Sequence, residues 1–119
     1  MRHPRGATKL RVMFGPEIAI GPGKAELLEA IAATGSISAS AKRLDMSYRR
    51  AWLLVDTMNR CFREPLVASA TGGTGGGGAH VTAFGRRVLE RYRAMQARVD
   101  RAIDPELAAF ALLLADRPR

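Results

Sequence analysis

The sequence is poor in cysteine and in long apolar runs. Among 119 residues there is one cysteine, Cys61, so neither an intrachain disulfide nor a multi-cysteine metal site is expected. The longest apolar run, residues 107–115, covers about half of the ~20 residues that cross a membrane. The start of the chain lacks the apolar stretch of a secretion signal. We therefore expect one domain, located in the cytoplasm.

Acidic residues are outnumbered by basic ones. The 19 lysines and arginines, 16 of them arginine, face 11 aspartates and glutamates, which gives a net charge of +8. This excess favours anionic partners, namely nucleic acid, anionic lipid or acidic protein. Composition does not choose among them, and charge that merely keeps an arginine-rich protein soluble is the alternative.

Residues that carry out chemistry are also scarce. His3 and His80 have no cysteine or patterned carboxylates nearby, and Cys61 fits a small apolar core residue. The glycine-rich stretch 71–78 lacks the GK[ST] sequence and the following helix of a nucleotide-binding loop. The sequence thus predicts no enzyme, no catalytic residue, no metal site and no cofactor bound by this chain.

The first half of the chain contains a helix-turn-helix pattern. After a flexible basic arm at 1–8, residues 9–20 predict two short strands around Gly15–Pro16, and residues 24–34 predict a helix that ends at Gly35. Ser36 and Ser47 are N-cap residues for the next two helices, which extend to residues 44 and 62. Asp45 tolerates the left-handed backbone of the sharp turn between them.

The glycine-rich stretch 71–78, called the wing below, lies between two predicted strands at 65–70 and 79–83. A helix, a helix-turn-helix and a hairpin in this order predict an α+β, mainly α, winged helix with an N-terminal β-hairpin. Glycines allow the backbone to approach phosphates or the minor groove closely. A disordered linker is the alternative interpretation of the wing.

The C-terminal part predicts a long dimerisation helix. Val88, Tyr92, Met95, Val99 and Ala102 in the predicted helix 84–103 step by 4, 3, 4 and 3, as in a short coiled coil. Asp104–Pro105 predicts the start of a last helix that is apolar on nearly every face. The expected organisation is an arm at 1–8, a DNA-binding domain at 9–83 and dimerisation helices with a tail at 84–119. The expected interface residues are Val88, Tyr92, Met95, Val99, Phe110 and Leu113.

The third predicted helix has two faces at 100° per residue. One face is a predicted core face that includes Ala51, Trp52 and Phe62, with Tyr48 ambiguous because its hydroxyl could reach a DNA backbone. The other is basic and is centred on Leu53. Arginine can bind a guanine edge with two hydrogen bonds, and leucine can contact a thymine methyl. Arginines that are only solvated surface charges are the alternative.

Two motifs at this spacing resemble a known family. SYRRAW at 47–52, within GSISASAKRLDMSYRRAWLLVDTMN, and TGGTGGGG at 71–78 are similar to the N-terminal winged-helix DNA-binding domain of the molybdate-responsive (ModE) regulators, which are related to LysR-type regulators. The resemblance covers residues 24–103. It implies a homodimeric bacterial transcription factor whose recognition helix, residues 47–62, enters the major groove. The residues implied or expected to contact DNA are Ser36, Ser38, Lys42, Ser47, Tyr48, Arg49, Arg50, Leu53, Arg60, Gly72, Gly73, Thr74, Gly75 and Gly76.

The sequence also departs from the pattern of this family. Thr74 stands where many members have lysine, so one phosphate contact of the wing is missing. We expect no separate oxyanion-binding module of the kind that full-length members carry, so molybdate is linked to this chain by family association only. Two alternatives to a sequence-specific regulator stay open: a nonspecific nucleic-acid-binding module, and a DNA-binding subunit whose 107–115 segment recruits a separate sensor protein.

Overall fold

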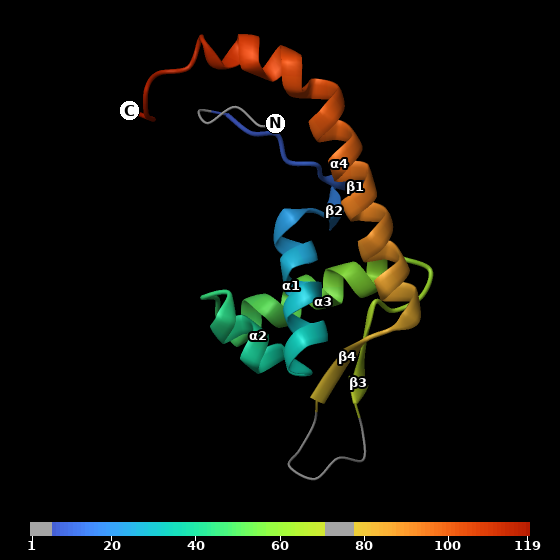
Figure 1. Ribbon diagram of the computed structural model, residues 1–119. Coiled ribbons are helices and arrows are strands. Elements are labelled where there is room, and N and C mark those ends of the chain that lie inside the picture. Colours follow the sequence, from blue (N-terminus) through green and yellow to red (C-terminus); the bar gives the residue numbers. More distant parts are fainter. Residues whose placement is uncertain (1–5, 71–77) are drawn as a thin grey trace.

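The computed structural model describes residues 6–70 and 78–119 (Figure 1). Over these residues the chain is an α+β fold that is mainly helical, which confirms the predicted fold class. The elements in chain order are β1 (Val12–Phe14), β2 (Glu17–Ile20), α1 (Pro22–Thr34), α2 (Ile37–Arg43), α3 (Tyr48–Cys61), β3 (Val67–Ala70), β4 (Gly78–Val81) and α4 (Ala83–Ala111). β1 pairs with β2, and β3 pairs with β4, both antiparallel.

The local signals of the helix-turn-helix are confirmed. Gly35 ends α1 with a φ of 71°, and Asp45 makes the turn between α2 and α3 with a φ of 57°. The Ser36 hydroxyl accepts a hydrogen bond from the Ala39 amide, and the Ser47 hydroxyl accepts one from the Arg50 amide, each at 3.0 Å. Each serine therefore satisfies an amide of a helix's first turn that has no partner within the helix.

The core lies where α1, α2 and α3 meet the β3–β4 hairpin. Leu27, Leu28 and Ile31 of α1 are fully buried, as is Met58 of α3. α1 begins at Pro22 rather than at residue 24, because proline is well suited to a first turn whose amide needs no helical partner. The Ala79 amide donates to the Gly35 carbonyl at 3.0 Å, so the hairpin is attached to the end of α1.

A second junction is centred on Leu66, which is fully buried just before β3. Its amide donates to the Asn59 side chain at 2.8 Å, and its carbonyl accepts from the Thr82 amide at 2.9 Å. The Thr82 hydroxyl caps α4 by accepting from the Gly85 amide at 2.9 Å. Leu66 therefore links α3, the hairpin and the start of α4 through backbone groups.

The predicted break at Asp104–Pro105 is wrong. Both residues lie inside α4, a single helix of 29 residues, and the helix is curved in Figure 1. Proline removes one helical hydrogen bond and can bend a helix without ending it when good helix formers continue the helix. The alanines and leucines after Pro105 are such residues. In the part of the chain that the structure describes, no helix has the length and apolarity needed to cross a membrane.

The predicted role of Tyr92 at a dimer interface is also wrong. Tyr92 is 1% exposed within a single chain, and its hydroxyl donates to the Leu10 carbonyl at 2.7 Å. The Leu10 amide donates to the Gln96 side chain, also at 2.7 Å. Val88 is half-buried against the same core. The apolar side chains that recur at intervals of four and three in the first turns of α4 therefore pack in the core of the same chain.

The predicted arm at 1–8 is only partly within the described residues. Gly6 lies so near the C-terminal half of α4 that an added Cβ would contact the side chains of Leu107 and Leu114. Thr8 lies beside Asp100 of the same helix, with their side-chain oxygens 3.5 Å apart. Residues 6–8 are thus placed along α4 rather than extended away from the domain.

Gly85 offers a direct test of the Leu66 junction. A Cβ at this position would collide with the Leu66 carbonyl, which is backbone and cannot rotate away, and with Val81. We expect Gly85→Ala to lower the free energy of unfolding by about 2–3 kcal/mol, as overpacking does. Urea unfolding followed by circular dichroism measures this change.

Gly23 in the first turn of α1 is the matched control. A Cβ there would meet nothing within 4 Å, so Gly23→Ala should leave stability unchanged or raise it slightly. Equal stability of the two variants would show that the close approach of α4 to Leu66 does not constrain the fold.

Candidate nucleic-acid interface

The solvent face of α3 presents the basic surface that the helical wheel predicts. Arg49, Arg50 and Arg60 are exposed, and Leu53 is 44% exposed among them. Ala51, Val55 and Met58 occupy the opposite, buried face. Three arginines therefore surround one apolar side chain on a helix whose N-terminus is capped by Ser47.

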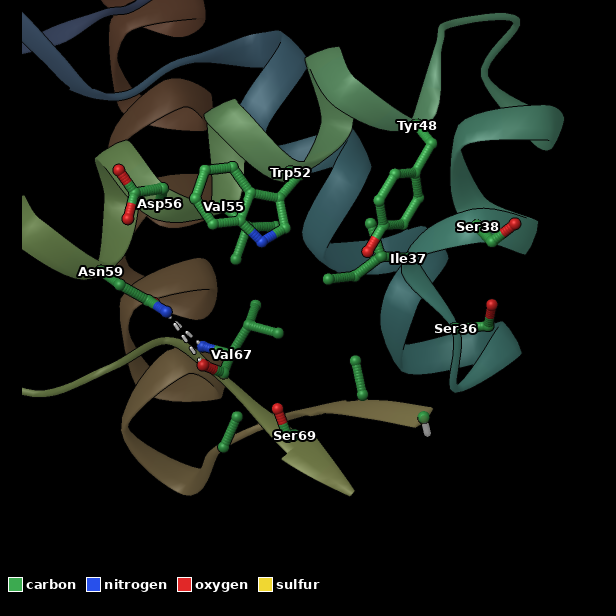
Figure 2. A pocket seen from close by; sticks show the side chains of 13 residues that line it. Ser36, Ile37, Ser38, Tyr48, Trp52, Val55, Asp56, Asn59, Val67 and Ser69 are labelled. Carbon is green, nitrogen blue, oxygen red and sulfur yellow. Dashed lines mark hydrogen bonds between the residues drawn. The ribbon is translucent and has the colours of Figure 1, made fainter. Parts of the chain in front are cut away.

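Trp52 does not lie in the core, which corrects the predicted core face. Its side chain is 48% exposed, and Tyr48, one turn earlier, is 57% exposed. The buried face is centred on smaller side chains, Ala51 and Val55, and a residue at its edge is turned toward solvent. In Figure 2 both rings project from α3 into the space above the hairpin.

These two rings form one wall of a groove of about 540 Å³ between α3, the start of α2 and the β3–β4 hairpin (Figure 2). The residues that line it are Ser36, Ile37, Ser38, Tyr48, Trp52, Val55, Asp56, Asn59, Val67, Ala68, Ser69, Gly78 and Ala79. The groove therefore brings the predicted DNA contacts Ser36, Ser38 and Tyr48 together.

The two ends of the groove differ in chemistry. Ser36, Ser38 and the Tyr48 hydroxyl lie toward one end, and Asp56 and Asn59 lie toward the other (Figure 2). Asp56 is paired with Arg60 at 3.0 Å, and this hydrogen bond raises the pKa of the Arg60 guanidinium. One end thus offers hydroxyl groups, and the other offers a carboxylate balanced by an arginine.

Asn59 fixes the hairpin to α3. Its side-chain carbonyl accepts hydrogen bonds from the Leu66 and Val67 amides at 2.8 and 3.2 Å, and its amide group donates to the Val67 carbonyl at 3.0 Å. Three bonds from one side chain hold the start of β3 at a set distance from α3. The sequence placed Asn59 on the inner face, but no pattern indicated its partners.

Two cations outside α3 differ in accessibility. Lys42, near the end of α2, is exposed as a phosphate contact requires. Lys24 in the first turn of α1 is buried, and burial lowers the pKa of its ammonium group, with a smaller contribution from the positive charge of Arg50. Helical spacing alone does not predict that this lysine is buried.

The predicted wing contacts cannot be placed. Gly72, Gly73, Thr74, Gly75 and Gly76 lie outside the described residues. The strands that flank them are paired from Val67↔Val81 to Ala70↔Gly78, beside the groove. Within residues 6–70 and 78–119, no group of three His, Cys, Asp or Glu side chains is arranged to hold a metal ion.

Comparison with known proteins relates this surface to transcriptional regulators. The chain is 43% identical over 86 residues to "Molybdenum transport protein ModE" of Azotobacter vinelandii, and 41% identical over 83 residues to "DNA-binding transcriptional dual regulator ModE" of Escherichia coli K12. It is 42% identical over 80 residues to "Molybdenum-pterin-binding protein MopB" of Rhodobacter capsulatus. Over these residues the chain is similar to part of each of these proteins, two of which are named ModE.

The match covers most of this chain but a minor part of its relatives. It includes 72% of the chain and 32% of the Azotobacter protein, and 70% of the chain and 32% of the Escherichia protein. The chain thus spans about a third of the length of these relatives. No family model matches. The relatives are named as regulators and as molybdenum-binding or transport proteins, and none of the three names given above is that of an enzyme.

The Asn59 contacts predict a loss of stability when this side chain is removed. In Asn59→Ala the Leu66 and Val67 amides lose their partner, so the free energy of unfolding should fall by about 2 kcal/mol. Asn59→Asp keeps the acceptor but loses the donor to the Val67 carbonyl. Its free energy of unfolding should therefore lie between those of Asn59→Ala and the unsubstituted chain. Urea unfolding gives these differences.

Thr57→Ala is the matched control on the same helix, because the Thr57 hydroxyl bonds only within α3, to the Leu53 carbonyl. It should change stability by less than about 0.5 kcal/mol. Unchanged hydrogen exchange at Leu66 and Val67 in Asn59→Ala would contradict the anchoring role of Asn59.

Proposed function

We propose that the chain binds double-stranded DNA in a sequence-specific manner and regulates transcription, with α3 inserted in the major groove. The observation that carries the proposal is the exposed face of α3, where Arg49, Arg50 and Leu53 follow a capped helix N-terminus. The relatives named as transcriptional regulators support the same function. Such a protein would act in the bacterial cytoplasm, where it meets the chromosome.

The residues at the start of α3 take different roles in this proposal. Arg49 and Arg50 read base edges, since a guanidinium forms two bonds to guanine, and Leu53 contacts a thymine methyl. The hydroxyls of Ser36, Ser38 and Ser47, with Lys42 and Arg60, contact phosphates and fix the register. The wing contacts the backbone or the minor groove beside them.

A homodimer completes the proposal. Met95, Phe110 and Leu113 of the C-terminal part are 42%, 58% and 79% exposed, and Val99 is half-buried. A second chain would cover these apolar side chains along α4. Two recognition helices related by a twofold axis would then read an inverted repeat with half-sites about 34 Å apart, one helical turn of DNA.

A nonspecific module that binds single strands is the second candidate. The exposed pair Tyr48 and Trp52 favours it, because aromatic rings exposed beside basic residues can stack on unpaired bases. The positions of Arg49 and Arg50 on a capped helix instead favour duplex recognition. The two candidates differ in their preference for duplex over single strands.

Substitution of the two arginines tests base recognition. We expect Arg49→Ala and Arg50→Ala each to weaken binding to a preferred duplex by about 1–3 kcal/mol and to relax the preference at particular base pairs. Competition between the preferred duplex, random duplex and single strands, at fixed salt, measures affinity and specificity together.

Arg98→Ala is the matched control, since Arg98 is an exposed arginine of α4 and not of α3. It removes the same charge and should leave base preference unchanged. If all three variants lose affinity equally on preferred and random DNA, the arginines contribute only charge and the specific role of α3 is refuted.

A further inference from the structure

The groove beside α3 has no basic side chain in a chain whose net charge is +8. No lysine or arginine is among its lining residues. The hairpin residues that line it, Val67, Ala68, Ser69, Gly78 and Ala79, are all uncharged. A DNA strand that enters the groove would therefore meet hydroxyl groups and apolar surface rather than cations.

The apolar surface of the groove is concentrated at Trp52. It is the chain's single tryptophan, it is 48% exposed, and Ile37 and Val55 line the groove beside it. A large aromatic side chain that is half exposed at the edge of a core leaves apolar area available to a ligand. Tyr48 extends the same wall and ends in a hydroxyl (Figure 2).

We propose, on the basis of the function inferred above, that this groove holds the sugar–phosphate backbone of one strand of the duplex. Trp52 packs against a deoxyribose, and the hydroxyls of Ser38 and Tyr48 donate to a phosphate. The contact is then largely independent of salt, because it releases few counterions, whereas each arginine–phosphate contact depends on salt.

The chemistry at the two ends of the groove determines which part of the backbone lies at each end. A phosphate fits the end lined by Ser36, Ser38 and Tyr48, because each of these side chains carries a hydroxyl that can donate a hydrogen bond. The opposite end holds the Asp56 carboxylate, which would repel a phosphate but can lie beside a neutral sugar. Asp56 is paired with Arg60 at 3.0 Å, and this positive charge weakens the repulsion between Asp56 and the next phosphate of the strand.

Tryptophan fluorescence gives the first test, since all of the signal comes from Trp52. Titration of the full chain with its preferred duplex should shift or quench the emission in proportion to the bound fraction found by anisotropy of labelled DNA. An emission spectrum that stays unchanged at saturation would overturn the proposal.

Trp52→Ala gives the second test. We expect about tenfold weaker binding to the preferred duplex, with the slope of log affinity against log salt unchanged. Trp52→Phe, which keeps an aromatic surface, should recover most of the loss. Lys42→Ala, which removes a proposed phosphate contact, should instead reduce the slope by about 0.9. Thermal unfolding of each variant checks that the fold is retained.

The outcomes separate this inference from the proposed function. If arginine variants lose duplex binding while Trp52→Ala binds like the unsubstituted chain, the groove proposal fails and the proposed function stands. If the unsubstituted chain does not prefer duplex, the proposed function fails. If Trp52→Ala loses single-strand binding more than duplex binding, Trp52 stacks on bases and the backbone role is refuted.

Discussion

The fold depends on the backbone of Leu66. Its amide is held by Asn59 of α3, its carbonyl accepts from Thr82, and Gly85 of α4 lies directly against it. A fully buried backbone segment needs a partner for each polar group, and here the partners come from the elements on both sides. The position of the hairpin relative to α3, and hence the groove, follows from these bonds.

The sequence predicted the features that depend on neighbours along the chain. Ser36, Ser47, Gly35 and Asp45 act through backbone groups within a few residues, so their capping and turn roles were evident from residue type and position. The order of helices and strands followed from periodicity and glycine positions. The basic face of α3 was also predictable, since helical spacing alone brings Arg49, Leu53 and Arg60 together.

Features that depend on packing partners were not predictable. Spacing placed Tyr92 in an interhelical seam, but Leu10, 82 residues earlier, supplies its partner within the same chain. A helical wheel gives the direction of Trp52 and not the depth of the core below it, so it predicts a buried side chain where the structure has a half-exposed one. The sequence context of Pro105 predicts a helix start, although the helix continues through it.

The exposure of Trp52 adds an apolar surface beside the basic face of α3. In the proposed function the basic residues of α3 supply charge and base recognition, while the groove beside them, which Asp56 but no lysine or arginine lines, offers apolar and hydroxyl contacts. The absence of lysine from the wing, where Thr74 stands, is consistent with a strand held by packing rather than by charge.

Selection of bound sequences from random duplex DNA by the full chain tests the central claim most directly. The account predicts an enriched inverted repeat whose half-sites are centred about one helical turn apart, or a multiple of it. Recovery of no preferred sequence, or tighter binding of single strands than of any selected duplex, would contradict it.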